Sequence, residues 1–253
     1  MNVVQIVFSP TGGTQRVADV IADEWGGTGS KIDLTDAKFD FSSAALVKSD
    51  IALVAVPSFG GRVPALAAQR LSAVHGNGTR CVIVCVYGNR AYEDTLIELS
   101  DLAKQSGFQV IAAVSAVAEH SILRQYAAGR PDRQDQDELR GIAEKILVRI
   151  NAENAAAPQI PGDRPYKKAG GVGLIPRAGK GCTGCGLCAK QCPAEAISRG
   201  NIKTADGKKC IACMRCVSQC PQSARKVNGV LVSVAAMAIK RACAQRKEIE
   251  LYI

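Results

Sequence analysis

The stretch VVQIVFSPTGGTQRVADVIADEW, residues 3–25, decides the fold of the first half of the chain. It opens with an apolar run typical of a buried strand and continues through a turn rich in glycine and hydroxyl residues. It ends in a segment whose apolar side chains have helical spacing. A strand that leads through such a turn into a helix is the first unit of an α/β domain with a parallel sheet.

The same alternation of strand and helix continues downstream. Apolar runs at residues 51–56, 81–86 and 110–117 predict buried strands. Residues 31–34 predict a shorter, weaker strand. Helical spacing of leucine and isoleucine fills the gaps, and such alternation indicates a sheet covered on both faces. We therefore predict an α/β fold over residues 1–155, with a doubly wound five-stranded parallel sheet in the order 2-1-3-4-5.

The turn after the first strand has the composition of a phosphate-binding loop. Its hydroxyls and its backbone amides would meet a ligand at the start of a helix. It lacks the lysine of a nucleoside-triphosphate loop and the GxGxxG dinucleotide pattern. A helix cap without a ligand is the alternative. The residues predicted to bind phosphate are Ser9, Pro10, Thr11, Gly12, Gly13 and Thr14.

Two more loops reach the same edge of the predicted sheet, where ligands of open α/β sheets bind. Both carry the glycine and aromatic residues that suit a flat aromatic group. The predicted binding residues are Pro57, Ser58, Phe59, Gly60, Gly61, Arg62, Tyr87, Gly88, Asn89, Arg90 and Tyr92. His120, just past the last strand, either joins this site or is a surface histidine.

A cysteine repeat marks the second half of the chain. The pattern Cys-x2-Cys-x2-Cys-x3-Cys-Pro occurs at residues 182–193 and again at residues 210–221. Soft thiolates at this spacing are typical of 4Fe-4S clusters, in which three cysteines of one array and the last of the other bind the same cluster. The predicted ligand sets are Cys182, Cys185, Cys188 and Cys220 for one cluster, and Cys210, Cys213, Cys216 and Cys192 for the other. Zinc or disulfides are the alternatives, but zinc arrays rarely repeat this third step and trailing proline.

Composition divides the remainder. Residues 156–180 form a basic linker rich in proline and glycine, residues 181–224 form the cysteine-rich α+β domain, and residues 225–253 form a helical extension. The formal charge is −3 over residues 1–155 and +12 over residues 156–253. The basic linker is either a solvated segment or a docking surface for an acidic partner protein.

These motifs resemble two families. Residues 181–224 resemble a bacterial two-cluster ferredoxin, and residues 1–155 resemble flavodoxin, in which the three loops hold FMN. Together the halves are similar to the flavodoxin–ferredoxin fusion proteins of anaerobes, the iron–sulfur flavoproteins. The resemblance implies FMN and two 4Fe-4S clusters as cofactors. Flavodoxins resemble one another in surrounding FMN with acidic residues, whereas here the two ring loops carry Arg62 and Arg90. Near the ring these arginines would stabilise the reduced, anionic flavin. The alternative is that one or both turn outward, or that Arg90 pairs with Asp94.

The function implied is electron transfer between these cofactors and a partner redox enzyme. The alternative is an FMN-dependent reductase of a small molecule such as a quinone, nitro compound, dioxygen or nicotinamide, and charge at Arg62 and Arg90 would favour it. No residue is predicted to be catalytic. No apolar run reaches the roughly 18 residues of a membrane span, and no nucleic-acid motif is present. We expect a cytoplasmic protein that acts with redox partner proteins, not with membrane or nucleic acid.

Overall fold

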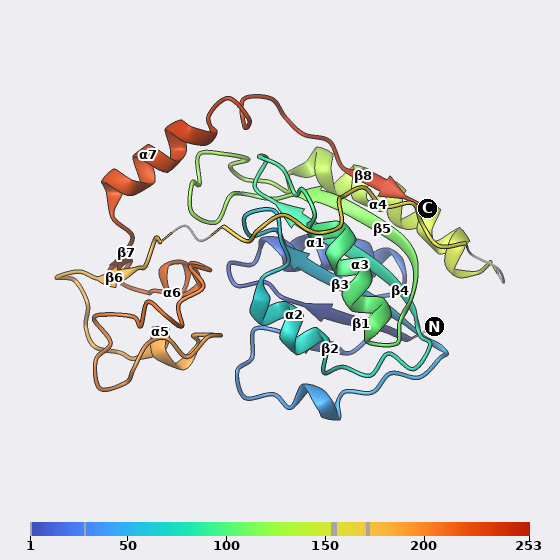
Figure 1. Ribbon diagram of the computed structural model, residues 1–253, viewed down its shortest axis with the longest axis horizontal. Coiled ribbons are helices and arrows are strands. Elements are labelled where there is room, and N and C mark those ends of the chain that lie inside the picture. Colours follow the sequence, from blue (N-terminus) through green and yellow to red (C-terminus); the bar gives the residue numbers. More distant parts are fainter. Residues whose placement is uncertain (1, 28, 153–155, 171–172) are drawn as a thin grey trace.

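The structure is a computed structural model that describes residues 2–27, 29–152, 156–170 and 173–253 (Figure 1). Its centre is a six-stranded sheet in the order β2-β1-β3-β4-β5-β8, whose first five strands are parallel. The strands are β1 (Asn2–Val7), β2 (Lys31–Asp33), β3 (Asp50–Pro57), β4 (Arg80–Tyr87), β5 (Gln109–Val117) and β8 (Glu250–Tyr252). The predicted order of the five parallel strands is confirmed, and it is the order of the flavodoxin-like doubly wound fold.

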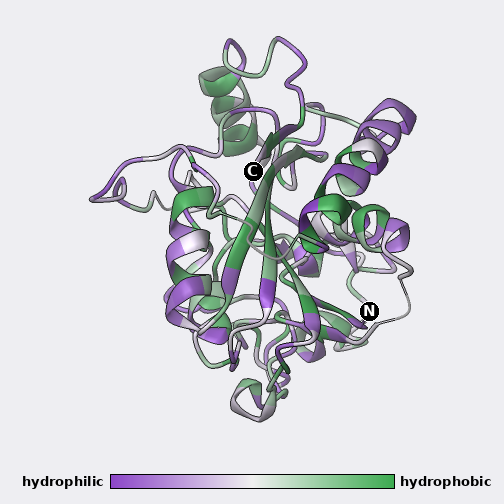
Figure 2. Cartoon of the chain, turned by 90° about the vertical axis from the view of Figure 1, so that its right-hand side faces the viewer, coloured by the Kyte–Doolittle hydropathy of each residue, from purple (hydrophilic) through white to green (hydrophobic). Residues whose placement is uncertain are grey.

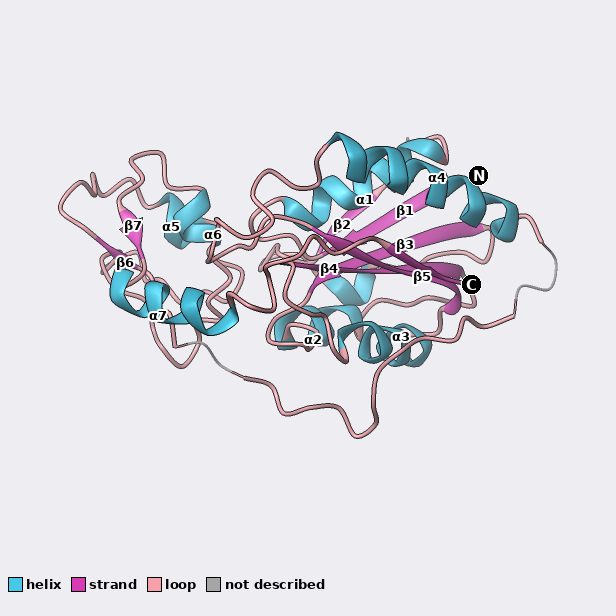
Figure 3. Cartoon of the chain, turned by 90° about the horizontal axis from the view of Figure 1, so that it is seen from above, coloured by secondary structure: helices cyan, strands magenta, loops and turns pink. Residues whose placement is uncertain are grey.

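Helices cover both faces of this sheet (Figure 3). One face carries α1 (Gly13–Glu24) and α4 (Arg133–Ile150), and the other carries α2 (Ala65–Leu71) and α3 (Thr95–Gln105). An apolar core lies between the sheet and each helical layer. Successive strand side chains point to opposite faces, so the strands supply both cores, and they run as green, hydrophobic ribbons through the domain in Figure 2.

Cys81, Cys85 and Trp25 are buried in these cores. Cys81 and Cys85 lie in the same core with no exposed surface, as small apolar side chains do. Trp25 follows α1, and its Nε1 donates a hydrogen bond to the carbonyl oxygen of Ala143 in α4 at 3.0 Å. That bond joins the two helices of one layer.

The sixth strand corrects the prediction of a five-stranded sheet and a purely helical extension. β8 runs antiparallel to β5 and pairs Ser115 with Glu250. The chain therefore returns to the first domain after the cysteine-rich part. We call residues 243–252 the C-terminal strap. Arg246 fastens it through ion pairs to Asp132 at 2.8 Å and to buried Asp135 at 2.7 Å.

The cysteine-rich part is built from short elements. A two-stranded sheet joins β6 (Arg177–Ala178) to β7 (Arg225–Lys226), and two four-residue helices, α5 (Leu187–Lys190) and α6 (Arg215–Ser218), follow the cysteine loops. A 3-10 helix, η1 (Phe41–Ser43), lies in the first domain between β2 and β3.

The last helix, α7 (Gly229–Ile239), lies in the extension that was predicted to be helical. None of its residues is buried, and Val230 and Met237 are 72% and 69% exposed. It runs between the cysteine-rich part and the strap in Figure 1. No helix in the described ranges is both long and apolar enough to cross a membrane.

The basic linker is held against the first domain. Arg164 makes two hydrogen bonds to Asp101 of α3, at 2.6 and 2.7 Å. Lys167 pairs with Glu93 at 2.6 Å, and its backbone amide donates to Asp94. Arg164 and Lys167 are thus paired with carboxylates of the same chain. The docking surface, one of the two predicted alternatives for the linker, would have to rely on its other basic residues.

Candidate functional site

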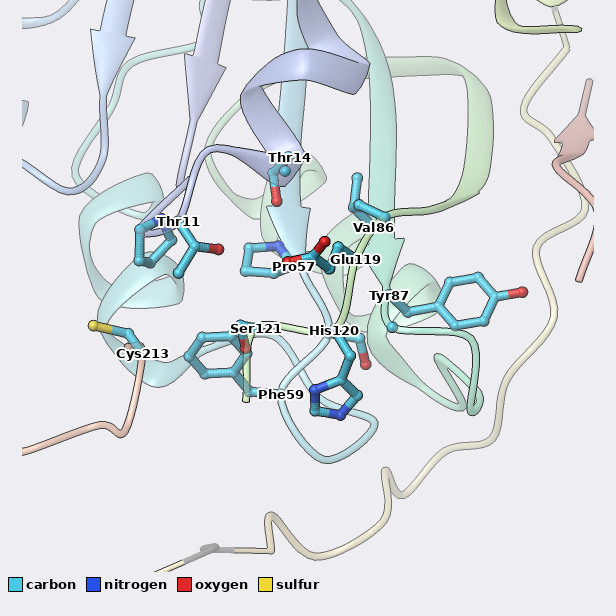
Figure 4. Close-up of a pocket in the computed structure, with 15 residues that line it drawn as sticks. Thr11, Thr14, Pro57, Phe59, Val86, Tyr87, Glu119, His120, Ser121 and Cys213 are labelled. Carbon is cyan, nitrogen blue, oxygen red and sulfur yellow. The ribbon is translucent and has the colours of Figure 1, made fainter. Parts of the chain in front are cut away.

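A hollow opens at the carboxyl ends of the parallel strands, the edge at which the sequence placed a ligand (Figure 4). It encloses about 480 Å³ of space, including space open to solvent. The lining residues are Pro10, Thr11, Gly13, Thr14, Pro57, Ser58, Phe59, Val86, Tyr87, Gly88, Ala118, Glu119, His120, Ser121 and Cys213. All three predicted loops contribute to it.

The glycine turn presents the start of α1 to this hollow. Gly12 has φ of 91°, a left-handed conformation that glycine adopts without strain, and it gives the helix no side-chain cap. Ser9 Oγ accepts the amide of Gln15 at 2.9 Å, so Ser9 serves as the cap and not as a lining residue. The first-turn amides of Gly13 and Thr14 have no intrahelical acceptor. This turn can bind an anion.

The second loop meets the hollow only through its first half. Pro57, Ser58 and Phe59 line it, whereas Gly60, Gly61 and Arg62 do not. Arg62 instead makes a two-pronged pair with Glu98 of α3, with both distances 2.7 Å, and lies over the ring of Tyr166. The guanidinium of Arg62, which was predicted to bind the ligand, is thus paired with a carboxylate from another element.

The third loop behaves in the same way. Tyr87 and Gly88 line the hollow, although Figure 4 shows the Tyr87 ring turned away from the other side chains. Arg90, which was also predicted to bind the ligand, pairs with Glu93 at 2.7 Å and is not a lining residue. Tyr92 also lies outside, because its hydroxyl bonds Glu250 and Tyr252 of the strap.

Asn89 belongs to the strap contact and not to the hollow. It is 4% exposed, and its Nδ2 donates to the carbonyl oxygens of Cys243 at 3.0 Å and Gln245 at 2.8 Å. Its Oδ1 accepts the amide of Lys247 at 3.1 Å. The side-chain amide of Asn89, a residue that was predicted to bind the ligand, therefore binds the returning chain in this structure.

The segment after β5 supplies a fourth wall. Of this segment only His120 was among the predicted binding residues, and the structure adds Ala118, Glu119 and Ser121. They immediately follow the last parallel strand, so the rule that selected the other loops could have found them. Val86, near the end of β4, also lines the hollow and was not among the predicted residues, although the same rule could have found it.

His120 is held as a neutral imidazole. Its Nδ1 accepts the amides of Ile122 and Leu123, both at 3.2 Å, so the ring proton is on Nε2. Burial, together with the nearby Arg90 guanidinium, lowers the pKa of His120. Gly88 makes this position possible, because a Cβ there would lie 2.6 Å from His120 Cδ2.

A second cavity gathers one predicted cysteine set. Its lining residues are Pro176, Cys192, Pro193, Ala194, Ala196, Ile197, Ala205, Cys210, Ile211, Cys213, Met214, Arg215 and Cys216. The four thiols thus surround one largely apolar space, although Cys192 comes from the other array. All eleven cysteines are free in this structure. Among the described residues, no three metal-binding side chains converge on a single point.

The structure repeats where the sequence repeats. The amide of Ala196 donates to Cys192 Sγ at 3.3 Å, and the amide of Ala224 donates to Cys220 Sγ at 3.3 Å. Such bonds to cysteine sulfur tune cluster potentials. In the other set, Cys185 is exposed and Cys182, Cys188 and Cys220 are half-buried, so this set lies nearer to solvent.

Cys213 lines both hollows. It is 9% exposed, and Figure 4 shows its sulfur pointing outward from the other labelled side chains. The sequence could not have placed it beside the first hollow, because that depends on how the two parts of the chain pack.

Comparison with known proteins adds a family for the second part. Residues 181–225 match the 4Fe-4S dicluster domain family. No curated protein matches the chain. Flavodoxins are among the similar solved structures: one from the domain Archaea is 15% identical over 60% of this chain and 100% of its own, with a TM-score of 0.41. That of Streptococcus pneumoniae TIGR4 is 24% identical over 58% and 98%, with a TM-score of 0.37. Flavodoxin 1 of Bacillus cereus is 16% identical over 58% and 98%, with a TM-score of 0.43.

The strand order, and not these low scores, defines the first domain. The dicluster match covers the cysteine-rich segment. The chain therefore joins a flavodoxin-like α/β fold to a segment that matches the 4Fe-4S dicluster domain family.

Proposed function

We propose that the chain is an electron-transfer protein that binds FMN in the hollow at the strand edge and two 4Fe-4S clusters in its cysteine sets. FMN exchanges one or two electrons and a cluster exchanges one, so the pair would link two-electron to one-electron chemistry. The observation that carries the proposal is the position of Cys213, which borders both the strand-edge hollow and the four-cysteine cavity.

The strand-edge hollow fits FMN. The amides of Gly13 and Thr14, with the hydroxyls of Thr11 and Thr14, are donors suited to a phosphate at a helix start. Phe59 and the Gly88 backbone offer flat surfaces for the ring. His120 Nε2 is a neutral donor on the same wall.

The cysteine sets fit clusters. Cys192, Cys210, Cys213 and Cys216 line one cavity, and they would hold a cluster there. Cys182, Cys185, Cys188 and Cys220 would hold the second one. Because Cys213 borders the flavin hollow and Cys185 is exposed, we place the first cluster next to FMN and the second towards the outside.

We further propose an acidic redox protein as partner and the cytoplasm as location. The chain beyond residue 155 carries a formal charge of +12, and complementary charge accelerates encounter between proteins. The partner would meet the outer cluster. The reductase alternative rested on positive charge from Arg62 and Arg90 near the flavin. Both arginines are paired with carboxylates, so their charge no longer favours that alternative.

The test quantifies iron, sulfide and flavin in the anaerobically purified protein. We expect about eight irons and one FMN per chain. C213S should lose about half of the iron and keep FMN, whereas the matched C243S, a buried thiol outside both sets, should keep both. Full iron in C213S, or loss of flavin with iron intact, would overturn the proposal.

A further inference from the structure

Arg225 is a buried arginine in the middle of the iron–sulfur segment. It lies in β7 with only 2% of its surface exposed. The repeat makes it unexpected: the first array continues Cys192-Pro-Ala-Glu-Ala-Ile197, and the second continues Cys220-Pro-Gln-Ser-Ala-Arg225. The equivalent position in the first array is thus a buried isoleucine, 5% exposed.

The contacts of Arg225 leave its charge unpaired. Nη1 donates to the carbonyl oxygen of Ile202 at 2.5 Å and Nη2 to that of Pro176 at 2.9 Å. Nε is buried without a hydrogen-bond partner. No carboxylate forms an ion pair with this guanidinium among the described residues, and burying an unpaired charge is costly.

The guanidinium lies between the two cysteine sets. Nη1 is 3.6 Å from Cys188 Sγ, which belongs to the outer set. On the other side, Nη2 is bonded to the carbonyl oxygen of Pro176, which lines the cavity of Cys192, Cys210, Cys213 and Cys216. Arg225 therefore lies between Cys188 of the outer set and the cavity that the other set lines.

We propose that Arg225 is a counter-charge shared by both clusters and that it raises the reduction potential of each. The inference rests on the proposed function, since it needs clusters in both cysteine sets. Each cluster with four thiolates is an anion, and reduction adds one more negative charge. A fixed positive charge in a poorly solvated space favours the reduced form, and the free Nε–H is available to a cluster sulfur.

The test compares four variants of the full chain for iron content and for the potentials of both clusters, followed by EPR during anaerobic redox titration. R225Q and R225I remove the charge, R225I by installing the residue of the first array. R225K keeps it. K226Q is the matched control, because it removes an exposed charge at the next position.

We expect the neutral variants to keep their iron and to become harder to reduce at both clusters. The equilibrium constant for reduction should fall at least about tenfold at each, which is ~59 mV for a one-electron couple. R225K and K226Q should stay within about threefold of the wild type. If the neutral variants lose iron while R225K retains it, the charge is needed to hold the anionic clusters, which also supports the proposal.

Two results would overturn the inference while leaving the proposed function intact. One is that R225Q or R225I keeps full iron and unchanged cluster potentials, or that R225K loses iron as well. Either outcome would mean that Arg225 has only a structural role, as the hydrogen-bond donor to the carbonyl oxygens of Pro176 and Ile202. The other is a change confined to one cluster, which would end the shared role. A wild-type protein without clusters would instead refute the proposed function itself.

Discussion

Replacing Gly88 by alanine tests the flavin hollow through one methyl group. The new Cβ would lie 2.6 Å from Cδ2 and 2.7 Å from Cβ and Cγ of His120. Two of these atoms are close to the His120 backbone, so rotation of the ring alone does not relieve the clash. His120 is also fixed, because its Nδ1 accepts two amides and its own amide donates to Tyr126 at 3.1 Å.

We therefore expect G88A to lower the free energy of unfolding of the first domain by about 1–3 kcal/mol, the usual cost of an overpacked core. Because both residues line the hollow, FMN affinity should fall about tenfold or more, which is ~1.4 kcal/mol. Urea unfolding of the flavin-free protein and flavin fluorescence titration measure the two effects.

G141A is the matched control. Gly141 lies inside α4, and a Cβ there meets no atom within 4 Å. Helix propensity predicts a gain of about 0.8–1 kcal/mol and no change in FMN affinity. Wild-type stability and affinity in G88A, alongside this gain in G141A, would refute the packing argument for the hollow.

Three further changes follow from single contacts. T14V removes a hydroxyl from the start of α1 and should weaken FMN binding by about 1 kcal/mol with iron content unchanged, as fluorescence titration and iron analysis would measure. R246Q removes the bonds that hold the pKa of Asp132 below its ordinary value of 3.8. Urea unfolding should find R246Q less stable than the wild type above that pH, with the gap closing at lower pH as Asp132 becomes protonated. W25F removes the bond to Ala143 and should lower the free energy of unfolding by about 1–3 kcal/mol, again by urea unfolding.

The strand order could be predicted because it follows from local pattern. Apolar runs separated by helices allow few topologies, and the doubly wound order is one of them. The strand β8 could not be predicted from the sequence. Glu250–Tyr252 is too short to show an apolar pattern, and its partner strand begins 141 residues earlier in the chain. Its position depends on the contacts of the C-terminal strap, which join residues far apart in the sequence and leave no local sequence pattern.

The same distinction separates the two halves of the site. The cysteine ligand sets are predicted from spacing, and the four cysteines of one set line the same cavity. Loop membership in the first hollow follows from strand ends. Side-chain direction does not: Arg62 and Arg90 turn to Glu98 and Glu93, and one of these carboxylates belongs to an element far from its partner in sequence.

The course of the chain explains why the two parts can be treated as one electron-transfer unit. The linker is bonded to α3, and the strap is bonded to the first domain and extends its sheet, so the cysteine-rich part is tethered at both of its ends. A third contact lies at the border itself, where Arg70 of α2 donates to the carbonyl oxygen of Pro193 at 2.7 Å, next to Cys192. Tethers at both ends and a direct contact restrict motion far more than one flexible linker does. In the proposed function the cluster beside FMN is thus held in place, and a partner has only to reach the outer cluster near exposed Cys185.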